Sequence, residues 1–277
     1  MDRIVQLGSD IVMLWGKYSS IYLRGMWSTI SLAVICTLVG CILGFLCGIL
    51  QTIPTTKKDN IIKRFFVGLI KVLVRIYVEV FRGTPMILQA VFIYYGLPYF
   101  TNNAVHFGSM WFAAFVIVSI NTGAYMAESV RGGILSIDIG QNEGAKAIGM
   151  THFQTMLFVV LPQALRNIMP QIGNNLIINI KDTSVMFIIG FAELFAAHKA
   201  VAGATYLYFP SATIEMVAYL TMTLASSFLL RWLENRMDGH DSYDLATKDT
   251  LAHTSGMVRY PKNAKTNAKS QLKERSR

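Results

Sequence analysis

The chain has 277 residues, of which 53% are hydrophobic and only 15% are charged. A soluble domain usually carries about 25% charged residues, so the composition excludes an ordinary soluble protein and predicts an integral membrane protein. The formal net charge of +9 does not indicate nucleic-acid binding, because the basic residues gather between and after apolar segments without interleaved aromatic residues.

No metal site or redox pair is predicted. The three cysteines lie together in the first apolar segment without a C-x-x-C pair, and the five histidines are scattered. Isolated thiols in an apolar helix are usually inert packing residues.

Residues 1–25 are expected to form an amphipathic helix on the membrane surface, because apolar residues recur at spacings of three and four. These residues are Ile4, Leu7, Ile11, Leu14 and Tyr18. The first membrane span is expected from about Met26 to Ile53. Gly40, Gly44 and Gly48 are spaced by four within it, which predicts a face that another helix can approach closely.

The second hydrophobic region, residues 61–98, is expected to be one long helix, broken at the Gly-Thr-Pro sequence that ends at Pro85. Proline lacks a backbone N–H and disfavours helix at the residue before it. In the charged first half, Glu79 is expected to pair with Arg82 as a structural anchor. In the short uncharged second half, Gln89 could hydrogen-bond a polar ligand or a neighbouring helix.

The third span is expected from about Met110 to Val130. Its residues Asn121, Tyr125 and Glu128 follow the spacing i, i+4, i+7, so they share one helical face. Glu128 also precedes Arg131 by three residues, which predicts a structural ion pair near the end of the span.

A short polar helix-turn-helix is expected within residues 131–162. Asn142 can cap its first helix, and Gly149 fits the left-handed position just past the end of that helix. Thr151 and Gln154 form a capping-box pattern at the start of the second helix. Pro162 is expected to stop or kink that second helix.

The fourth and fifth spans are expected at about residues 168–195 and 214–233. Five spans place the two termini on opposite sides of the membrane. The basic loop at residues 57–64, the polar hairpin and the basic tail at residues 238–277 all fall on one side. The positive-inside rule therefore predicts an outer N-terminus and a cytoplasmic C-terminus, and the polar tail is expected to be disordered.

The fourth span contains a polar stripe. Asn175, Asn179 and Asp182 follow the spacing i, i+4, i+7 on one face. An ionisable residue inside a span is costly unless it faces a cavity or a partner. Two interpretations stay open: Asp182 attracts an ammonium or guanidinium group of a substrate, or it forms a structural pair with Lys181.

The polar hairpin carries the pattern E-x-A-x3-G-x9-(I/V)-x-L-P, formed by Glu143, Ala145, Gly149, Leu161 and Pro162. This pattern resembles the EAA loop of bacterial ABC import permeases, with Glu143 expected at the positive end of the first helix. The resemblance implies that this hairpin, residues 131–162, is a cytoplasmic coupling region that docks into a separate ATPase subunit.

Further segments extend the resemblance in family order. They are Y-x-E-x-x-R-G-T-P at residues 77–85, A-Y-x-x-E-x-x-R-G-G-I at residues 124–134, L-P-Q-A at residues 161–164 and K-D-T-S at residues 181–184. Together they are similar to the polar amino acid branch of these importers over about residues 26–237, the expected permease domain. Gly144 departs from the family's usual alanine, and a glycine inside a helix costs about 0.5–1 kcal/mol.

The resemblance assigns candidate roles to individual residues. In the polar amino acid branch the aspartate of the K-D-T-S segment lies near the substrate path, which implies that role for Asp182. The expected substrate pathway comprises Glu79, Gln89, Tyr125, Asn175, Asn179 and Asp182. The expected ATPase-coupling residues are Glu143, Gly144, Ala145, Gly149, Leu161 and Pro162.

The resemblance implies an all-α, multi-pass permease subunit of an ATP-driven importer in the bacterial cytoplasmic membrane, working by alternating access. The sequence contains no phosphate-binding G-x4-G-K-[ST] loop, so no cofactor is expected in this chain, and ATP and Mg²⁺ would bind the partner ATPase. The other expected partners are a second permease subunit, identical or paralogous, an extracytoplasmic amino-acid-binding protein and membrane lipid.

Two other classes of membrane protein fit the sequence less well. A secondary transporter of a polar solute, driven by an ion gradient through Asp182 or Glu79, often carries internal repeats; none is visible here, and five spans cannot divide evenly. The second alternative is a membrane enzyme. The sequence contains no Ser-His-Asp set, no metal-spaced histidines and no nucleotide-binding loop that would support it.

Overall fold

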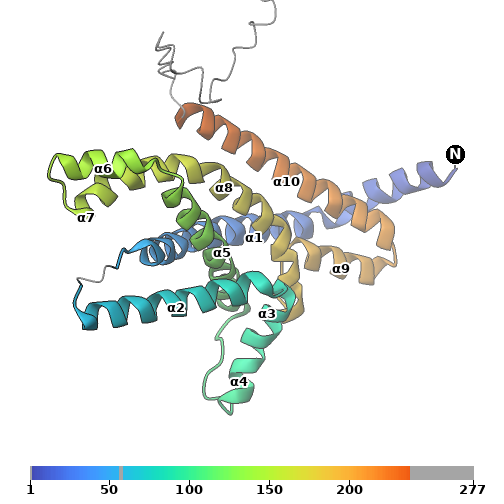
Figure 1. The fold of residues 1–277 in the computed structure, drawn as a ribbon. Coiled ribbons are helices and arrows are strands. Elements are labelled where there is room, and N and C mark those ends of the chain that lie inside the picture. The colour runs from blue at the N-terminus through green and yellow to red at the C-terminus, as the bar shows by residue number, and fades with distance from the viewer. Residues whose placement is uncertain (1, 56–58, 238–277) are drawn as a thin grey trace, which may run out of the picture. The chain divides into compact units, whose positions relative to one another are not determined.

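The computed structural model describes residues 2–55 and 59–237, and every regular element in them is a helix (Figure 1), which confirms the all-α prediction. The elements are α1 (Asp2–Thr52), α2 (Ile61–Gly83), α3 (Met86–Tyr94), α4 (Gly96–Phe100), α5 (Met110–Leu135), α6 (Ile139–Ala147), α7 (His152–Thr155), a π-helical turn (Met156–Val160), α8 (Leu161–Asp182), a 3-10 helix (Thr183–Ile189), α9 (Leu194–Thr205) and α10 (Tyr208–Met237). The expected disordered tail, residues 238–277, lies outside the described residues.

Within residues 2–55 and 59–237, three helices are long and apolar enough to cross a membrane, and they lie in α1, α5 and α10. A fourth span results if His152–Ile189 and Leu194–Thr205, which are bent by 55°, count as one. α2 has 23 residues, which exceeds the length of about 20 residues that a span needs, but it carries charges along its length. The number of five spans and the orientation therefore stay predictions.

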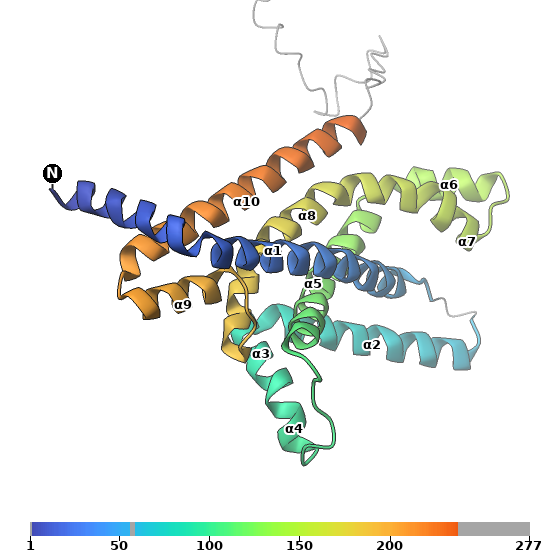
Figure 2. The same ribbon diagram turned by 180° about the vertical axis from the view of Figure 1, so that it is seen from behind.

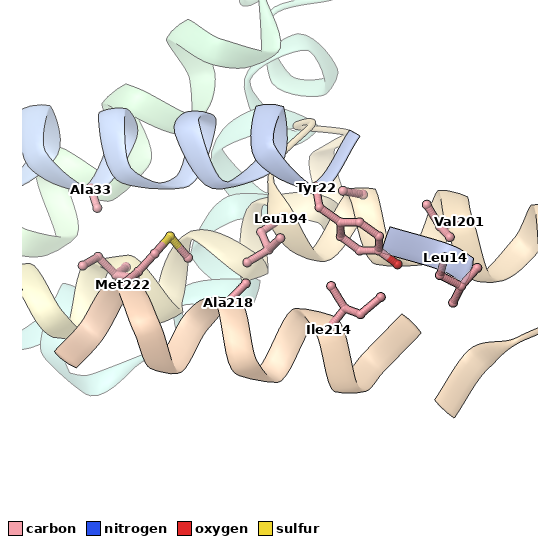
Figure 3. Close-up of a cluster of buried hydrophobic side chains, with 10 residues drawn as sticks. Leu14, Tyr22, Ala33, Leu194, Val201, Ile214, Ala218 and Met222 are labelled. Atoms are coloured by element: carbon pink, nitrogen blue, oxygen red, sulfur yellow. The ribbon is translucent and has the colours of Figure 1, made fainter. Parts of the chain in front are cut away.

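α1 is one helix of 51 residues with no break near residue 25. Its first half differs from the expected surface helix, because Leu14 and Tyr22 are fully buried in a cluster with residues of α9 and α10. Figure 3 shows this cluster, with Tyr22 beside Leu194 and Ile214. The apolar stripe that the sequence revealed therefore packs partly against the protein itself.

The glycine row of α1 packs against α5, as the sequence predicted, and the two helices cross in both views (Figure 2). A Cβ atom added at Gly40 would lie 2.6 Å from Cβ of Thr122, and one added at Gly48 would lie 2.6 Å from Cγ1 of Val130. No side chain fits at these distances, so glycine sets how closely α1 approaches α5.

The break between α2 and α3 occurs where the sequence predicted it. Thr84 has an extended backbone with φ −121° and ψ 145°, and Pro85 precedes the first residue of α3. Because proline cannot continue the hydrogen-bond ladder, the chain turns at this point. A second interruption at Tyr95 separates α3 from α4.

The expected fourth span, residues 168–195, is wrong in its boundaries. The helix ends at Ile189, because Gly190 takes the left-handed conformation with φ +82° that closes helices. Glu193 then caps α9, a helix of 12 residues that lies mostly in the segment between the expected fourth and fifth spans. α9 packs against α1 and α10, which explains why an alanine-rich segment without strong periodicity is helical.

Candidate functional site

A polar cavity of about 240 Å³ lies where the break between α2 and α3 meets α5 and α8. We call it the asparagine cavity. It is lined by Thr84, Pro85, Met86, Asn121, Thr122, Tyr125, Asn175, Ile178, Asn179 and Asp182. Four of the six residues expected in a substrate pathway, Tyr125, Asn175, Asn179 and Asp182, thus line one cavity.

The asparagine side chains of the cavity are held by neighbouring helices. Asn179 donates to Oγ1 of Thr37 at 2.8 Å and accepts from Oγ1 of Thr122 at 3.1 Å, so it connects α1, α5 and α8. Asn175 donates to Sδ of Met126 on α5 at 2.9 Å and to the carbonyl of Gln171, within α8 itself, at 3.1 Å. Because buried amides are costly without partners, these bonds fix the shape of the cavity wall.

Gln89 lies behind the cavity wall. Its amide group donates to the carbonyls of Phe81 at 2.8 Å and Thr84 at 2.9 Å, and its carbonyl oxygen accepts from Asn121 at 2.9 Å. Gln89 therefore satisfies the backbone groups that Pro85 leaves open at the end of α2. Its contacts are those of a support for Asn121, and it is not among the lining residues.

Asp182 differs from the asparagines because its carboxylate accepts no hydrogen bond from any described residue. The neighbouring Lys181 lines a different cavity, of about 390 Å³, together with Glu215 and Tyr219. No ion pair within 4 Å joins Lys181 to Asp182 in the described part of the chain. The half-buried carboxylate therefore faces the asparagine cavity with its acceptor capacity unused, at the junction where α8 narrows into the 3-10 helix.

Glu79 lies in a second cavity, of about 310 Å³, which we call the cationic cavity. It is lined by Gln51, Lys71, Arg75, Val78, Glu79, Arg82, Glu128 and Arg131. The structure therefore does not bring Glu79 together with Asp182.

The two ion pairs expected near these cavities have different outcomes. The pair between Glu128 and Arg131 is confirmed, with Nε of Arg131 donating to Oε2 of Glu128 at 3.1 Å. The pair between Glu79 and Arg82 is absent from the ion pairs of the described residues. The guanidinium group of Arg82 lies instead over the ring of Tyr125, 5.8 Å from its centroid, a cation–π arrangement.

The hairpin of α6 and α7 begins earlier than the sequence suggested. Asp138, not Asn142, caps α6 by accepting a hydrogen bond from the backbone of Gly140, so Glu143 lies inside the helix. Both residue types cap helices well, and the helix extends to the first of them. At the other end, Gly149 has φ +83° as predicted, and the capping box of Thr151 and Gln154 is present.

The hairpin presents apolar side chains that the sequence interpretation did not single out. Ile148 is 79% exposed and Phe153 is 73% exposed, on either side of the Gly149 turn. Ala145 is buried, whereas an added Cβ at Gly144 would meet nothing within 4 Å. Exposed apolar groups at the tip of a short polar hairpin are typical of a docking surface. Their position beside the predicted left-handed glycine could have identified them.

Pro162 does not stop the second helix, because helical structure continues from His152 to Asp182. A π-helical turn at Met156–Val160 precedes it, and the backbone N–H of Leu161 donates to the carbonyl of Met156. α8 then starts at Leu161 with Pro162 in its first turn. A proline is tolerated there, because the wider π turn leaves room for a residue that lacks an N–H.

A separate buried polar network was missed entirely. Glu193 is 1% exposed and accepts hydrogen bonds from the backbone of Phe195 and Ala196 and from the hydroxyl of Tyr219, each at 2.8 Å. Nearby, Oγ of Ser211 lies 2.6 Å from the hydroxyl of Tyr22 and 2.9 Å from Nδ1 of His198. These groups come from α1, α9, α10 and the turn before α9, so only their shared burial brings them together.

Comparison with known proteins decides the family. The model of the family described as "Binding-protein-dependent transport system inner membrane component" matches residues 40–239. The chain belongs to this family. It is therefore a membrane-embedded transport subunit of a binding-protein-dependent system rather than an enzyme.

Individual relatives are consistent with this assignment. The chain is 41% identical over 162 residues to the glutamine transport system permease protein GlnP of Escherichia coli K12, covering 58% of this chain and 73% of that protein. It is 32% identical over 219 residues to the arginine transport system permease protein ArtQ of Bacillus subtilis, covering 79% and 93%.

Solved structures share the fold. An amino acid ABC transporter crystallised with histidines superposes with a TM-score of 0.70 at 33% identity, over 81% of this chain and 97% of that one. The methionine ABC transporter MetNI in an inward-facing conformation superposes with a TM-score of 0.59 at 20% identity, over 81% and 95%. The second likeness shows the fold alone.

Proposed function

We propose that this family member is the permease subunit of an ATP-driven importer for polar amino acids, and that the asparagine cavity lies in its substrate path. One observation carries the proposal for the cavity: the carboxylate of Asp182 faces a polar cavity in an apolar protein and has no hydrogen-bond donor among the residues that the structure describes. A carboxylate held there is costly unless a cationic group approaches it. The amino acids named for the relatives, glutamine and arginine, both offer an α-ammonium group.

The wall of the cavity suits a zwitterion with a polar side chain. Asn175 and Asn179 present amides whose positions are fixed by contacts with Met126 of α5 and Thr37 of α1. The hydroxyl of Tyr125 can donate or accept a hydrogen bond. Fixed polar groups can replace part of the hydration that an amino acid loses on entering the membrane. Such a site binds weakly enough to release its ligand when the helices move.

The α6–α7 hairpin would transmit the work of the ATPase. Its exposed Ile148 and Phe153 would dock into the separate ATP-binding subunit, and the continuous path from α7 through the π turn to α8 would carry the movement to Asp182. Glu143, Gly144, Ala145, Leu161 and Pro162 shape this hairpin and its exit. A nucleotide-driven change shifts the permease only if docking favours one of its states.

The assembly follows from this role. Two permease subunits, identical or paralogous, would enclose the path, two ATPases would hold the ATP and Mg²⁺, and an extracytoplasmic binding protein would deliver the amino acid. The hairpin and the basic loop near residue 57 would face the cytoplasm of a bacterial cell, with the N-terminus outside.

The experiment that tests the coupling role replaces Gly149 by valine. The φ of +83° at this position is strained for a β-branched residue, whereas an added Cβ would meet no neighbour within 4 Å. We expect the Gly149→Val protein to reach the membrane, to retain little ATPase on co-purification and to lose transport. Gly16→Val is the matched control, because that position is also open but lies inside the helix α1, outside the hairpin. Normal transport and normal ATPase recovery in Gly149→Val would disprove the coupling assignment.

A further inference from the structure

The cationic cavity has more positive than negative charge. Four cations, Lys71, Arg75, Arg82 and Arg131, and two carboxylates, Glu79 and Glu128, line its walls, which leaves a formal excess of two positive charges (four minus two). None of these six side chains is fully buried, and Arg75, Glu79 and Arg82 are exposed, so the cavity is open to a ligand. A concave surface with an excess of positive charge attracts anions.

Internal pairing uses only part of the positive charge. Glu128 binds Arg131 in a two-point ion pair, and Arg82 lies over the ring of Tyr125. No described carboxylate comes within 4 Å of the side-chain nitrogen atoms of Lys71 or Arg75. These two side chains stand one helical turn apart on the face of α2 that lines the cavity. They are therefore the groups available to an anion.

The cationic cavity adjoins the asparagine cavity along the groove between α2 and α5. At the end of α2, Arg82 lines the cationic cavity and Thr84, two residues later, lines the asparagine cavity. On α5, Glu128 lines the cationic cavity and Tyr125, one turn earlier, lines the asparagine cavity. The contact of Arg82 with the Tyr125 ring lies between them. From Glu128, α5 continues within two turns to the segment before α6, so the cationic cavity lies on the side of the hairpin.

We infer that the cationic cavity is an inner station for the α-carboxylate of the transported amino acid, occupied after the amino acid leaves Asp182 and before it is released. This inference rests on the proposed function. An amino acid carries one charge of each sign, and the two cavities carry the two complementary signs. Each of the two cavities binds only one end of the amino acid. Binding at either cavity is therefore weak enough for the ligand to leave, as conduction through a pathway requires. Arg75 can present two parallel N–H groups to a carboxylate, and Lys71 adds a point charge.

The test compares an amino acid with its amide on the complete transporter in nanodiscs without nucleotide or binding protein. The probes are L-arginine with L-argininamide and L-glutamine with L-glutaminamide, at about pH 6.5, where the α-amino group stays protonated in both forms. The amides keep the ammonium and lose the carboxylate charge. The permeases are wild type, Lys71→Gln/Arg75→Gln, and Arg64→Gln, which removes a cation of α2 outside the cavity.

We expect the effect of removing the ligand carboxylate and the effect of removing the two cations to be non-additive in the binding affinity. Wild type and Arg64→Gln should prefer the amino acid over its amide by about tenfold, and the double variant should reduce this preference to about twofold or less. Arg75→Lys, tested alone, should retain most of the preference because it keeps the charge. A double variant that prefers the amino acid as strongly as wild type would overturn the inference.

Two further outcomes separate the possible causes of failure. If the cavity holds a lipid phosphate, the preference for the amino acid will be equal in all variants. ATP-driven uptake into phosphatidylcholine proteoliposomes will then depend on added phosphatidylglycerol for wild type and Arg64→Gln but not for the double variant, which also overturns the inference. If wild type neither binds nor transports any amino acid of a panel, the proposed function itself fails. Binding by wild type with an unchanged preference in the double variant rejects the inner station alone.

Discussion

Glu193 and Asp182 are two carboxylates of the same apolar protein with opposite surroundings. Glu193 is 1% exposed, and two backbone N–H groups and the hydroxyl of Tyr219 bind it at 2.8 Å each. Asp182 is half-buried, faces a cavity of about 240 Å³ and has no donor among the described residues. The first carboxylate is fully satisfied by the fold, and the second is left available to a ligand.

The difference teaches how to separate structural from functional charge in a membrane protein. Both residues would be flagged by the rule that ionisable groups in apolar segments are costly. The number of hydrogen-bond donors that the fold supplies distinguishes them, because a satisfied group has little to gain from a ligand. By this criterion Glu193 is a structural link between α9 and α10, and Asp182 is the carboxylate that we propose for the substrate path.

The largest effect should come from breaking the satisfied group. Glu193→Ala leaves two backbone N–H groups and a tyrosine hydroxyl without their acceptor, so we expect stability to fall by about 3–5 kcal/mol. Thermal denaturation of the purified permease in detergent measures this. Glu193→Gln keeps an acceptor oxygen and should lose clearly less. If the alanine variant is as stable as wild type, Glu193 does not have the structural role assigned to it.

Asp182→Asn should have the opposite profile, with transport lost and stability retained. Removing the charge should lower the uptake rate by the equivalent of about 2–5 kcal/mol, as for other buried charge pairs that lose one partner. Thermal stability should change by less than about 1 kcal/mol, because Asp182 has no hydrogen bond to lose among the described residues. Uptake is measured at matched membrane levels. Full uptake by this variant would place Asp182 outside the substrate path.

A double variant distinguishes a ligand site from a hidden pair. Replacing a whole buried ion pair by apolar residues is often tolerated, so Lys181→Met with Asp182→Leu would restore activity if the two residues were partners. Because they line different cavities, we expect uptake to stay as low as in Asp182→Asn. Lys181→Met alone is the control and should retain more uptake than the double variant. Rescue by the double variant would make Asp182 part of the scaffold.

An intermediate effect is expected at Asn175, which is satisfied like Glu193 but lines the cavity like Asp182. Asn175→Ala removes its hydrogen bond to Gln171, so stability should fall by about 1 kcal/mol. Uptake should fall several-fold, less than in Asp182→Asn, because no charge is lost. A variant with unchanged transport kinetics would limit the path to the charged end of the cavity.

The smallest effect is expected from the tail. Residues 238–277 are polar, lack hydrophobic periodicity and lie beyond the segments that resemble the family. A chain truncated after Met237 should therefore transport at a rate close to wild type, measured as uptake at matched membrane levels. Loss of uptake in a truncated chain that still inserts would reveal a role for the tail.

The sequence by itself determined the features that depend on backbone chemistry. Pro85 breaks α2 from α3, Gly149 takes positive φ, and Thr151 and Gln154 form their capping box, because each signal acts over a few neighbouring residues. The glycine row of α1 also identified a packing face, since only small residues allow two helices to approach so closely. The shared face of Asn175, Asn179 and Asp182 followed from helical periodicity alone.

Only the tertiary structure decided which groups meet. Asp138 and Asn142 are both good caps, and the sequence could not choose between them. α9 is helical because α1 and α10 pack against it, and the first half of α1 is buried against the same helices. The partners of Glu193 and the separation of Glu79 from Asp182 depend on residues distant in the chain. Local sequence rules describe which conformations and hydrogen bonds a residue can adopt. The fold decides whether a partner is within reach, and the presence of that partner determines the free energy of a buried charge.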